Sequence, residues 1–148
     1  MNREILFKAK RLDNGEWAEG YLFDDGMPKL KRYFIGGIII KPYEGTACDK
    51  WNVVGIDFCE IDIDTLCQYT GLTDKNGKKI WENDICNRKE KYPEIVTYNK
   101  GDWQLDYSYV FGKEMHTDAC NLGFYACERN CVEVIGNVFD NADLLEVE

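Results

Sequence analysis

Apolar and polar residues alternate in short runs along most of the chain, and residues that favour turns separate these runs. Alternation with a period of two is typical of half-buried strands, whereas Gly, Pro, Asn and Asp between the runs mark turns. In the first half the expected strands are Ile5–Arg11, Glu16–Phe23, Leu30–Ile35, Ile38–Lys41 and Val53–Ile63. In the second half they are Glu94–Tyr98, Trp103–Tyr109 and Cys131–Phe139. The pattern therefore predicts a mainly β protein made of antiparallel hairpins, with little helix.

Short signals rich in Gly, Asn and Asp predict the connections between these strands. Asp13–Gly15 and Asn99–Asp102 each stand between two expected strands. Asn76-Gly77 is the strongest hairpin signal, because a two-residue type I′ turn needs positive φ at both central residues, which Asn and Gly tolerate best. Gly36-Gly37 leaves two alternatives open, a tight hairpin or one strand with a glycine kink. The imperfect alternation within Val53–Ile63 predicts a β-bulge.

Two segments depart from the strand pattern. Residues 110–130 show no sustained period, and we expect two short strands around an exposed tip there. Near the end of the chain, Asp140-Asn141 predicts a helix cap before the short segment Ala142–Leu145. That segment is too brief to be stable alone, so we expect it to pack on the rest of its domain.

The stretch Gln68–Ile85, which reads QYTGLTDKNGKKIWENDI, resembles the signature of the YopX family of phage- and prophage-encoded proteins. The opening segment Phe7–Tyr21 and the closing segment Glu133–Leu145 are similar to the two ends of the same family, in the same order. Asn83 stands where the family usually has Gly, but Asn also tolerates a left-handed backbone, so the turn is expected to survive. The resemblance implies an SH3-like small barrel in the second half. It implies no activity and no catalytic residue.

Chain length and motif positions set the expected domain organisation. A chain of 148 residues can bury a sufficient core without disulfides or metals. We expect an N-terminal β-hairpin subdomain over residues 1–64, packed on a C-terminal SH3-like barrel over residues 65–148 that carries an irregular insertion at about 110–130. Within the signature, Asp84 is expected to accept backbone N–H bonds at the start of a strand, which is a structural role.

The charge of the chain disfavours binding to nucleic acids. The formal net charge is −9, and the acidic excess lies after residue 47, where 10 basic and 20 acidic side chains follow 8 and 7 in the first part. An acidic body repels phosphates, so a nucleic-acid-binding SH3-like module would need a local basic patch. The candidate patch is Lys29, Lys31 and Arg32, beside two aromatic residues. Its ordinary interpretation is a solvated face of antiparallel strands.

Cysteine and histidine offer one candidate metal pattern. The seven cysteines are odd in number and no export signal precedes them, so we expect free thiols. His116, Cys120, Cys127 and Cys131 lie within sixteen residues and have the side chains that coordinate zinc. Their spacing differs from the paired Cys-x2-Cys pattern of fingers and ribbons. The favoured interpretation is that these cysteines pack as small apolar residues, and no metal or cofactor is expected.

Other patterns typical of enzymes are missing from the sequence. No Gly-rich phosphate loop and no G-x-S-x-G elbow is present, and Ser108 is the only serine. A Ser108–His116 pair has no supporting pattern, so no residue is assigned a catalytic role. We therefore expect a protein that is not an enzyme. A zinc- or cysteine-dependent enzyme stays as a second alternative, after nucleic-acid binding.

Self-association is the expected mode of action. A β-rich chain of many short hairpins exposes strand edges, and proteins often satisfy such edges by pairing with another copy. The expected interface residues are Tyr33, Phe34, Ile38, Ile39 and Ile40, although such residues are also typical of a core. A host protein is a further expected partner. No apolar run is long enough to cross a membrane and no signal peptide is seen, so a cytoplasmic protein of a bacterial host cell is expected.

Overall fold

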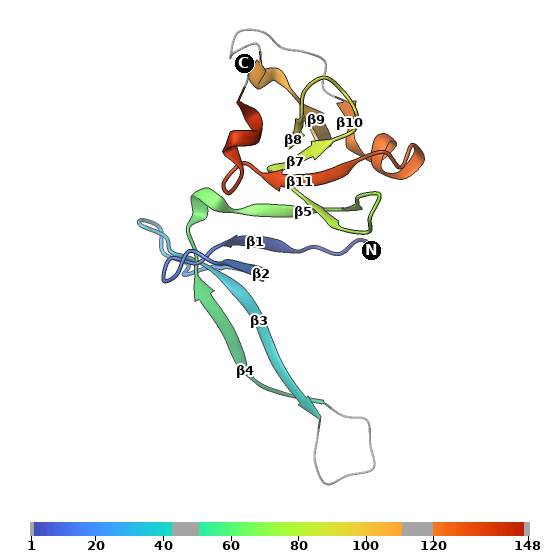
Figure 1. The fold of residues 1–148 in the computed structure, drawn as a ribbon. Helices are drawn as coiled ribbons and strands as arrows, with labels where there is room; N and C mark the ends of the chain where they lie inside the picture. The colour runs from blue at the N-terminus through green and yellow to red at the C-terminus, as the bar shows by residue number, and fades with distance from the viewer. Residues whose placement is uncertain (1, 43–50, 111–119, 147–148) are drawn as a thin grey trace. The chain divides into compact units, whose positions relative to one another are not determined.

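The computed structural model describes residues 2–42, 51–110 and 120–146. The strands are β1 (Phe7–Lys10), β2 (Trp17–Asp24), β3 (Tyr33–Pro42), β4 (Trp51–Glu60), β5 (Cys67–Thr73), β6 (Lys79–Trp81), β7 (Asp84–Asn87), β8 (Glu94–Asn99), β9 (Asp102–Asp106), β10 (Cys120–Asn121) and β11 (Glu133–Asn137). The short helical segments are η1 (Ile63–Thr65), η2 (Ser108–Val110), η3 (Phe124–Glu128) and η4 (Ala142–Leu145). The prediction of a mainly β protein with antiparallel sheets and little helix is confirmed (Figure 1).

The chain divides into two compact units. One unit is Ile5–Leu66, and the other combines Met1–Glu4 with Cys67–Glu148. The division therefore lies two residues after the predicted boundary at residue 64, and η1 (Ile63–Thr65) closes the first unit. In that closure the buried Thr65 hydroxyl accepts a hydrogen bond from the Lys10 backbone N–H at 2.8 Å.

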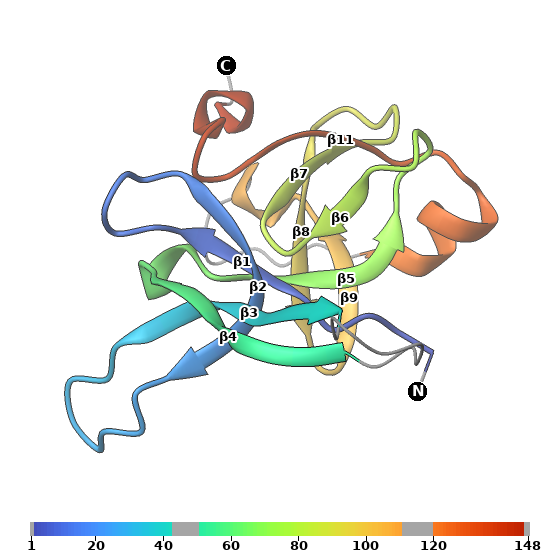
Figure 2. The same ribbon diagram turned by 90° about the horizontal axis from the view of Figure 1, so that it is seen from below.

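The first unit is an antiparallel sheet with the strand order β4-β3-β2-β1 (Figure 2). The β1–β2 hairpin turns at the predicted Asp13–Gly15 signal, where Gly15 has a φ of 71°. One face of the sheet carries the core of the unit, made by Ala9, Ile35 and Ile61, which are nearly inaccessible to solvent. The other face is exposed and is described below.

Of the two alternatives for Gly36-Gly37, the structure has the single strand, because β3 runs without a break through both glycines. Gly36 pairs with Tyr21 of β2 on one side and with Phe58 of β4 on the other. A Cβ atom at Gly36 would lie 1.9 Å from the carbonyl oxygen of Asp57 and 2.6 Å from the Cβ of Phe58. The close approach of β4 to β3 therefore requires glycine at this position.

The β3–β4 pairing also contains the predicted bulge. The register shifts between Ile39, which faces Gly55, and Ile40, which faces Val53, so Val54 has no directly opposite partner. Such a bulge restarts the pairing after an extra residue and explains the imperfect alternation in the sequence.

The second unit contains an antiparallel sheet with the strand order β10-β9-β8-β7-β11, and β5 also pairs with β6 in this unit. Its core is a cluster of buried aliphatic side chains and one thiol. The members are Ile80, Cys86, Val96, Leu105, Leu122, Ala126, Val132 and Val134. β10 and β11 are the edge strands of this sheet and, within the described residues, are not paired with each other. Closure of the unit into an SH3-like barrel therefore stays a prediction.

Asp74 explains why the signature segment turns where it does. Its Oδ1 accepts hydrogen bonds from the backbone N–H groups of Asn76 and Lys78, and its Oδ2 accepts one from Val134 of β11, all at 2.9–3.0 Å. Only Gly77 of the Asn76-Gly77 pair has positive φ, 80°, so the predicted type I′ turn is wrong. The Asp74 carboxylate instead holds a longer loop that ends in a left-handed glycine.

Replacing Asp74 with Asn is expected to lower the free energy of unfolding by about 2 kcal/mol at pH 7, since hydrogen bonds to a charged acceptor contribute ~1.5–3 kcal/mol. Burial raises the pKa of Asp74, but the N–H donors of Val134, Lys78 and Asn76 outweigh it and hold that pKa below its usual value. The stabilisation is therefore present above about pH 4 and is lost as the pH falls through the lower native pKa.

Urea unfolding at pH 7, 5 and 3 measures this difference. The gap between the wild type and Asp74→Asn should narrow at the lowest pH. Asp64→Asn, which changes an exposed carboxylate of η1, is the matched control and should leave unfolding nearly unchanged. A gap of constant size at every pH would refute the assigned role of the carboxylate.

Two further turn predictions are confirmed. Asn83 has a φ of 68°, so it occupies the left-handed position that Gly takes in the family pattern. Asp84 is buried and its Oδ2 accepts the backbone N–H of Trp81 at 2.8 Å, which is the expected structural bracket. The two positive φ values that a type I′ turn needs are found between β8 and β9, at Lys100 and Gly101.

The end of the chain differs in part from the prediction. The described residues 120–130 contain one short strand, β10, followed by the helical segment η3, whereas the rest of the predicted strand pair falls on residues 111–119, which lie outside the described residues. Asn141 precedes η4 as predicted but makes no side-chain cap bond, because its Oδ1 accepts the backbone N–H of Asn137 at 3.1 Å. No helix within the described part of the chain is long and apolar enough to cross a membrane.

Candidate interaction surface

The exposed face of the first unit carries a row of large apolar side chains. Directly opposite residues of neighbouring antiparallel strands point to the same face of a sheet, and every second residue along a strand does too. The registers of β2, β3 and β4 therefore place eight apolar residues on this face. We call this set the apolar face; its members are Tyr21, Phe23, Phe34, Ile38, Ile40, Val53, Ile56 and Phe58.

The apolar face is open to solvent over most of its extent. Ile38 is 57% exposed, Ile56 is 61% exposed and Phe58 is 54% exposed, although all three are large and apolar. A side chain of this size that is half exposed leaves about 100 Å² accessible, since a whole aromatic side chain covers roughly 150–250 Å². The eight members together expose roughly 700 Å², whereas the largest apolar patch of a typical monomer covers ~300–600 Å².

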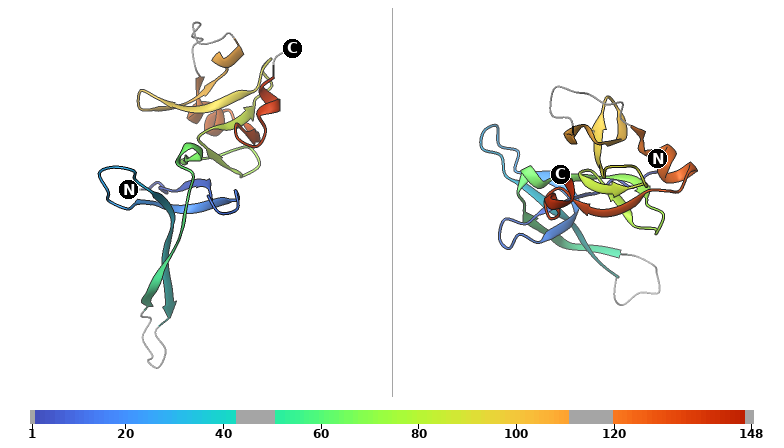
Figure 3. Two further views of the ribbon diagram at one scale, coloured as in Figure 1. Left: turned by 90° about the vertical axis from the view of Figure 1, so that its left-hand side faces the viewer. Right: turned by 45° about the horizontal axis from the view of Figure 1, so that its top comes forward.

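Half of the apolar face lies on a two-stranded ribbon. In the described part of the chain, β2 pairs with β3 only over Tyr33–Gly36, while β3 continues its pairing with β4 as far as residue 42. We call the ribbon of residues 37–42 and 51–57 the β3–β4 arm (Figure 3). Ile39 is 40% exposed on the opposite face of the arm, which also carries the polar residues Asp57, Lys41 and Asn52. An isolated two-stranded ribbon is marginally stable in water, so this arm gains from being covered.

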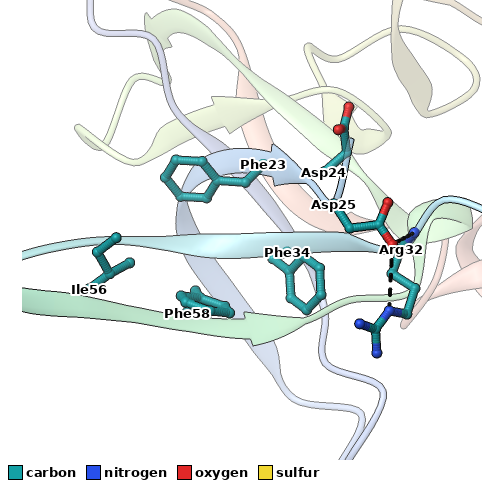
Figure 4. A pocket seen from close by; sticks show the side chains of 7 residues that line it. All are labelled: Phe23, Asp24, Asp25, Arg32, Phe34, Ile56 and Phe58. Carbon is teal, nitrogen blue, oxygen red and sulfur yellow. Dashed lines mark hydrogen bonds and ion pairs between the residues drawn. The ribbon is translucent and has the colours of Figure 1, made fainter. Parts of the chain in front are cut away.

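A pocket of about 410 Å³ lies at the base of the arm. Gly36 lies between Tyr21 and Phe58 in the strand register, and β4 approaches it closely. The rings of Phe34 and Phe58 meet edge to face, with 5.4 Å between their centroids. The residues around the pocket are Phe23, Asp24, Asp25, Arg32, Phe34, Ile56 and Phe58 (Figure 4).

Charged side chains at one end of the pocket neutralise each other. The Asp25 carboxylate accepts hydrogen bonds from the backbone N–H groups of Met27 and Arg32, and these bonds hold its pKa below its usual value. The guanidinium Nε of Arg32 lies 3.6 Å from Asp25, and the Lys31 ammonium lies 3.7 Å from Asp24. The pocket is therefore apolar with a rim of two ion pairs.

The structure places the predicted interface residues on different sides of β3. Phe34, Ile38 and Ile40 belong to the apolar face, and Ile39 is exposed on the opposite side of the arm. Tyr33 instead packs against the core cluster of the first unit. Sequence reasoning named the β3 residues but missed the partners on β2 and β4, because those become neighbours only through strand pairing.

The candidate basic patch lies in the connection between β2 and β3. Lys31 and Arg32 form the ion pairs with Asp24 and Asp25, whereas Lys29 is exposed. Ion pairing to adjacent carboxylates reduces the positive potential that a phosphate backbone would meet.

The cysteines of the candidate metal pattern have separate surroundings. Cys120 accepts a hydrogen bond from the guanidinium of Arg88 at 3.1 Å, and the Cys131 thiol donates to the carbonyl oxygen of Tyr125 at 3.7 Å. Cys127 is exposed, and His116 lies outside the described residues. Residues 2–42, 51–110 and 120–146 contain no group of three or more potential ligands placed to hold a metal ion.

The most deeply buried charges belong to the second unit. Glu94 is 1% exposed, and its carboxylate accepts two hydrogen bonds from Arg88, whose guanidinium lies 4.2 Å from the ring centroid of Tyr125. Burial raises the pKa of Glu94, and the Arg88 hydrogen bonds oppose that rise. Burial also raises the pKa of the Cys86 thiol, so this thiol stays protonated at neutral pH. Arg88 and the buried Glu94 form an ion pair, and Cys86 packs in the core of the second unit, so these groups stabilise the fold.

The fold and the surface define a small, mainly β protein with a large exposed apolar face. Residues 18–146 match the family model described as YopX protein, so the chain belongs to the YopX family. No curated protein matches this chain. The crystal structure of protein EF1440 from Enterococcus faecalis is similar to it, with a TM-score of 0.57 and 21% sequence identity over 98% of this chain and 100% of that chain. At this identity the likeness shows a shared fold.

Proposed function

We propose that this protein is a self-associating binding protein without enzymatic activity, and that its apolar face packs against the same face of a second copy. The observation that carries the proposal is the row of eight apolar side chains on three strands, of which all but the partly buried Phe34 are exposed to water. Leaving roughly 700 Å² of apolar surface in water costs ~25 cal/mol for each Å², so covering it releases a large free energy.

The size of the apolar face supports a second copy as the occupant. A standard protein interface buries about 800 Å² on each partner, which is close to the apolar area exposed here. Homo-oligomers most often form through one patch that contacts itself about a two-fold axis. The apolar face can contact itself in this way, because apolar side chains on one copy pack well against the same side chains on the other. The ion pairs at its rim are neutral overall, so they add no net repulsion between the copies.

The surroundings of the titratable side chains support a binding role over catalysis. Asp74 and Asp84 accept backbone hydrogen bonds, and Glu94 is held by Arg88, so these buried carboxylates serve the fold. A catalytic acid or base must instead reach a substrate. Cofactors are therefore no part of the proposal.

The proposed biological setting follows from the family. The sequence resembles proteins that phages and prophages encode, and we place its action in the cytoplasm of the bacterial host. A host protein is the alternative occupant of the apolar face. Nucleic acid is disfavoured because the net charge is −9 and two of the three candidate cations are ion-paired.

Native mass spectrometry of the untagged protein, purified gently from a bacterial lysate and diluted in steps, tests the proposal. The expected species are multiples of the 17.2 kDa chain that dissociate on dilution, with no added mass from metal or nucleic acid. A monomer at every concentration would overturn self-association. A stoichiometric host protein in place of the second copy would also overturn self-association. One zinc per chain or bound nucleic acid would overturn the proposal in favour of a zinc-dependent enzyme or a nucleic-acid-binding module.

A further inference from the structure

We propose that two copies pack their apolar faces with their arms antiparallel, so that the tip of each β3–β4 arm fills the pocket at the base of the other arm. This arrangement rests on the proposed self-association and specifies its geometry. It follows from the difference between the two ends of the apolar face: one end has a pocket, and the other has exposed β-branched side chains.

One end of the apolar face has the pocket at the base of the arm. The aromatic side chains of Phe23, Phe34 and Phe58 line it, together with Ile56. A volume of about 410 Å³ falls within the ~300–1,000 Å³ range of sites that bury small molecules, so it accommodates aliphatic side chains from a partner.

The other end is the part of the apolar face farthest from the pocket among the residues with described side chains, and we call it the tip of the arm. Ile40 and Val53 are directly opposite each other there, and they are 48% and 64% exposed on the apolar face. Both are β-branched, so their side chains are stiff and lose little conformational entropy when they enter a pocket. Contacts between aromatic and β-branched side chains are among the favourable pairs on sheet surfaces.

The strand register relates these two ends by symmetry. Along β3, Ile38 lies two residues from Gly36 at the base and two residues from Ile40 at the tip, and it pairs with Ile56. A two-fold axis that lies in the interface plane, perpendicular to the strands and level with the Ile38–Ile56 pair, therefore places the tip of each arm over the base of the other. Base and tip are about 13 Å apart at ~3.3 Å per strand residue, so one rotation brings both contacts together.

The charges along the face agree with this arrangement. Ile38 and Ile56 at the axis are uncharged, and the one charged residue that β4 adds to this face, Glu60 opposite Phe34, lies at the base, so the axis region brings no like charges together. Lys41 follows Ile40 and points to the opposite side of the strand, away from the contact. At the base, each ion pair remains within its own copy.

Cross-linking between introduced cysteines tests the antiparallel arrangement in the full chain. Stacked sheets lie about 10 Å apart, beyond the ~4.4–6.8 Å that a disulfide spans between Cα atoms, so a short bis-maleimide is the suitable reagent. Three single variants are needed: Ile56→Cys at the axis, Ile40→Cys at the tip and Phe58→Cys at the base. Wild-type protein, which has seven native cysteines, gives the background.

The arrangement predicts a specific pattern of cross-linked dimers. Ile56→Cys should cross-link to itself, Ile40→Cys alone should stay at the wild-type background, and an equal mixture of Ile40→Cys and Phe58→Cys should give a mixed dimer at least several-fold above background. Mass spectrometry of the linked peptides confirms the positions.

The outcomes separate this inference from the proposed function. An assembled protein in which Ile40→Cys cross-links strongly to itself has parallel arms, which overturns the arrangement and leaves self-association intact. An assembled protein with none of the three cross-links above background uses another surface and overturns it as well. A protein that is monomeric at every concentration overturns both the arrangement and the proposed function.

Discussion

The double variant Ile38→Asp/Ile56→Asp is expected to be monomeric at concentrations where the wild type is assembled, with a dissociation constant raised by at least ~10³-fold. The two residues form the centre of the apolar face and are opposite each other in the β3–β4 pairing. Assembly would bury two carboxylates from each copy beside two from the other copy. Removing charges from water without partners costs several kcal/mol, and a 10³-fold change corresponds to about 4 kcal/mol.

Sedimentation velocity over a concentration series measures this effect. The fold of the isolated chain should persist, because both residues are more than half exposed and make few core contacts. Leu12→Asp is the matched control: Leu12 is 59% exposed, but it lies in the β1–β2 turn outside the apolar face. Leu12→Asp should assemble like the wild type. Assembly of the double variant at wild-type affinity would show that the apolar face is not the interface.

The second large effect is expected for Gly36→Ala, which should lower the free energy of unfolding by about 3 kcal/mol or more. The added methyl group would overlap the backbone of β4, at 1.9 Å from the Asp57 carbonyl oxygen and 2.6 Å from the Cα of Phe58. Overpacking in a well-packed region costs typically ~1–3 kcal/mol, and more where backbone must move. Since β4 would be displaced from β3, the pocket and the arm should be distorted too.

The neighbouring glycine provides the control for this variant. A Cβ atom at Gly37 would have its nearest contact at 3.8 Å, with Cδ2 of Tyr21, which is ordinary van der Waals distance. Gly37→Ala should therefore change stability by less than about 1 kcal/mol, since surface substitutions usually have small effects. Urea unfolding of both variants gives the comparison. Equal stabilities of the two variants would contradict the close β3–β4 approach.

Local patterns were sufficient for much of the fold. The turn at Asp13–Gly15, the left-handed residue at Asn83 and the structural role of Asp84 were all predictable, because each depends on residues close in sequence. The loop after β5 (Cys67–Thr73) was predicted as a type I′ turn and is longer. Its geometry depends on Asp74, whose second oxygen binds the backbone of Val134, sixty residues away.

The apolar face was only partly predictable. The consecutive residues Ile38, Ile39 and Ile40 resemble a strand buried on both faces, and they were named as interface candidates from the sequence. Their exposure follows from the end of the β2–β3 pairing at Gly36, which no local pattern specifies. The pocket depends on three strands meeting in one register, and the Arg88–Glu94 pair depends on burial in the folded unit, so both required the structure.

Hydrogen–deuterium exchange at two protein concentrations, one above and one below the dissociation constant, tests self-association through the apolar face most directly. Residues 37–41 and 52–58 are expected to exchange more slowly in the concentrated sample. Peptides from β8 (Glu94–Asn99) and β9 (Asp102–Asp106), in the other unit, should exchange at the same rate in both. Equal exchange of the arm at both concentrations, in a sample shown to change its assembly state, would contradict the account.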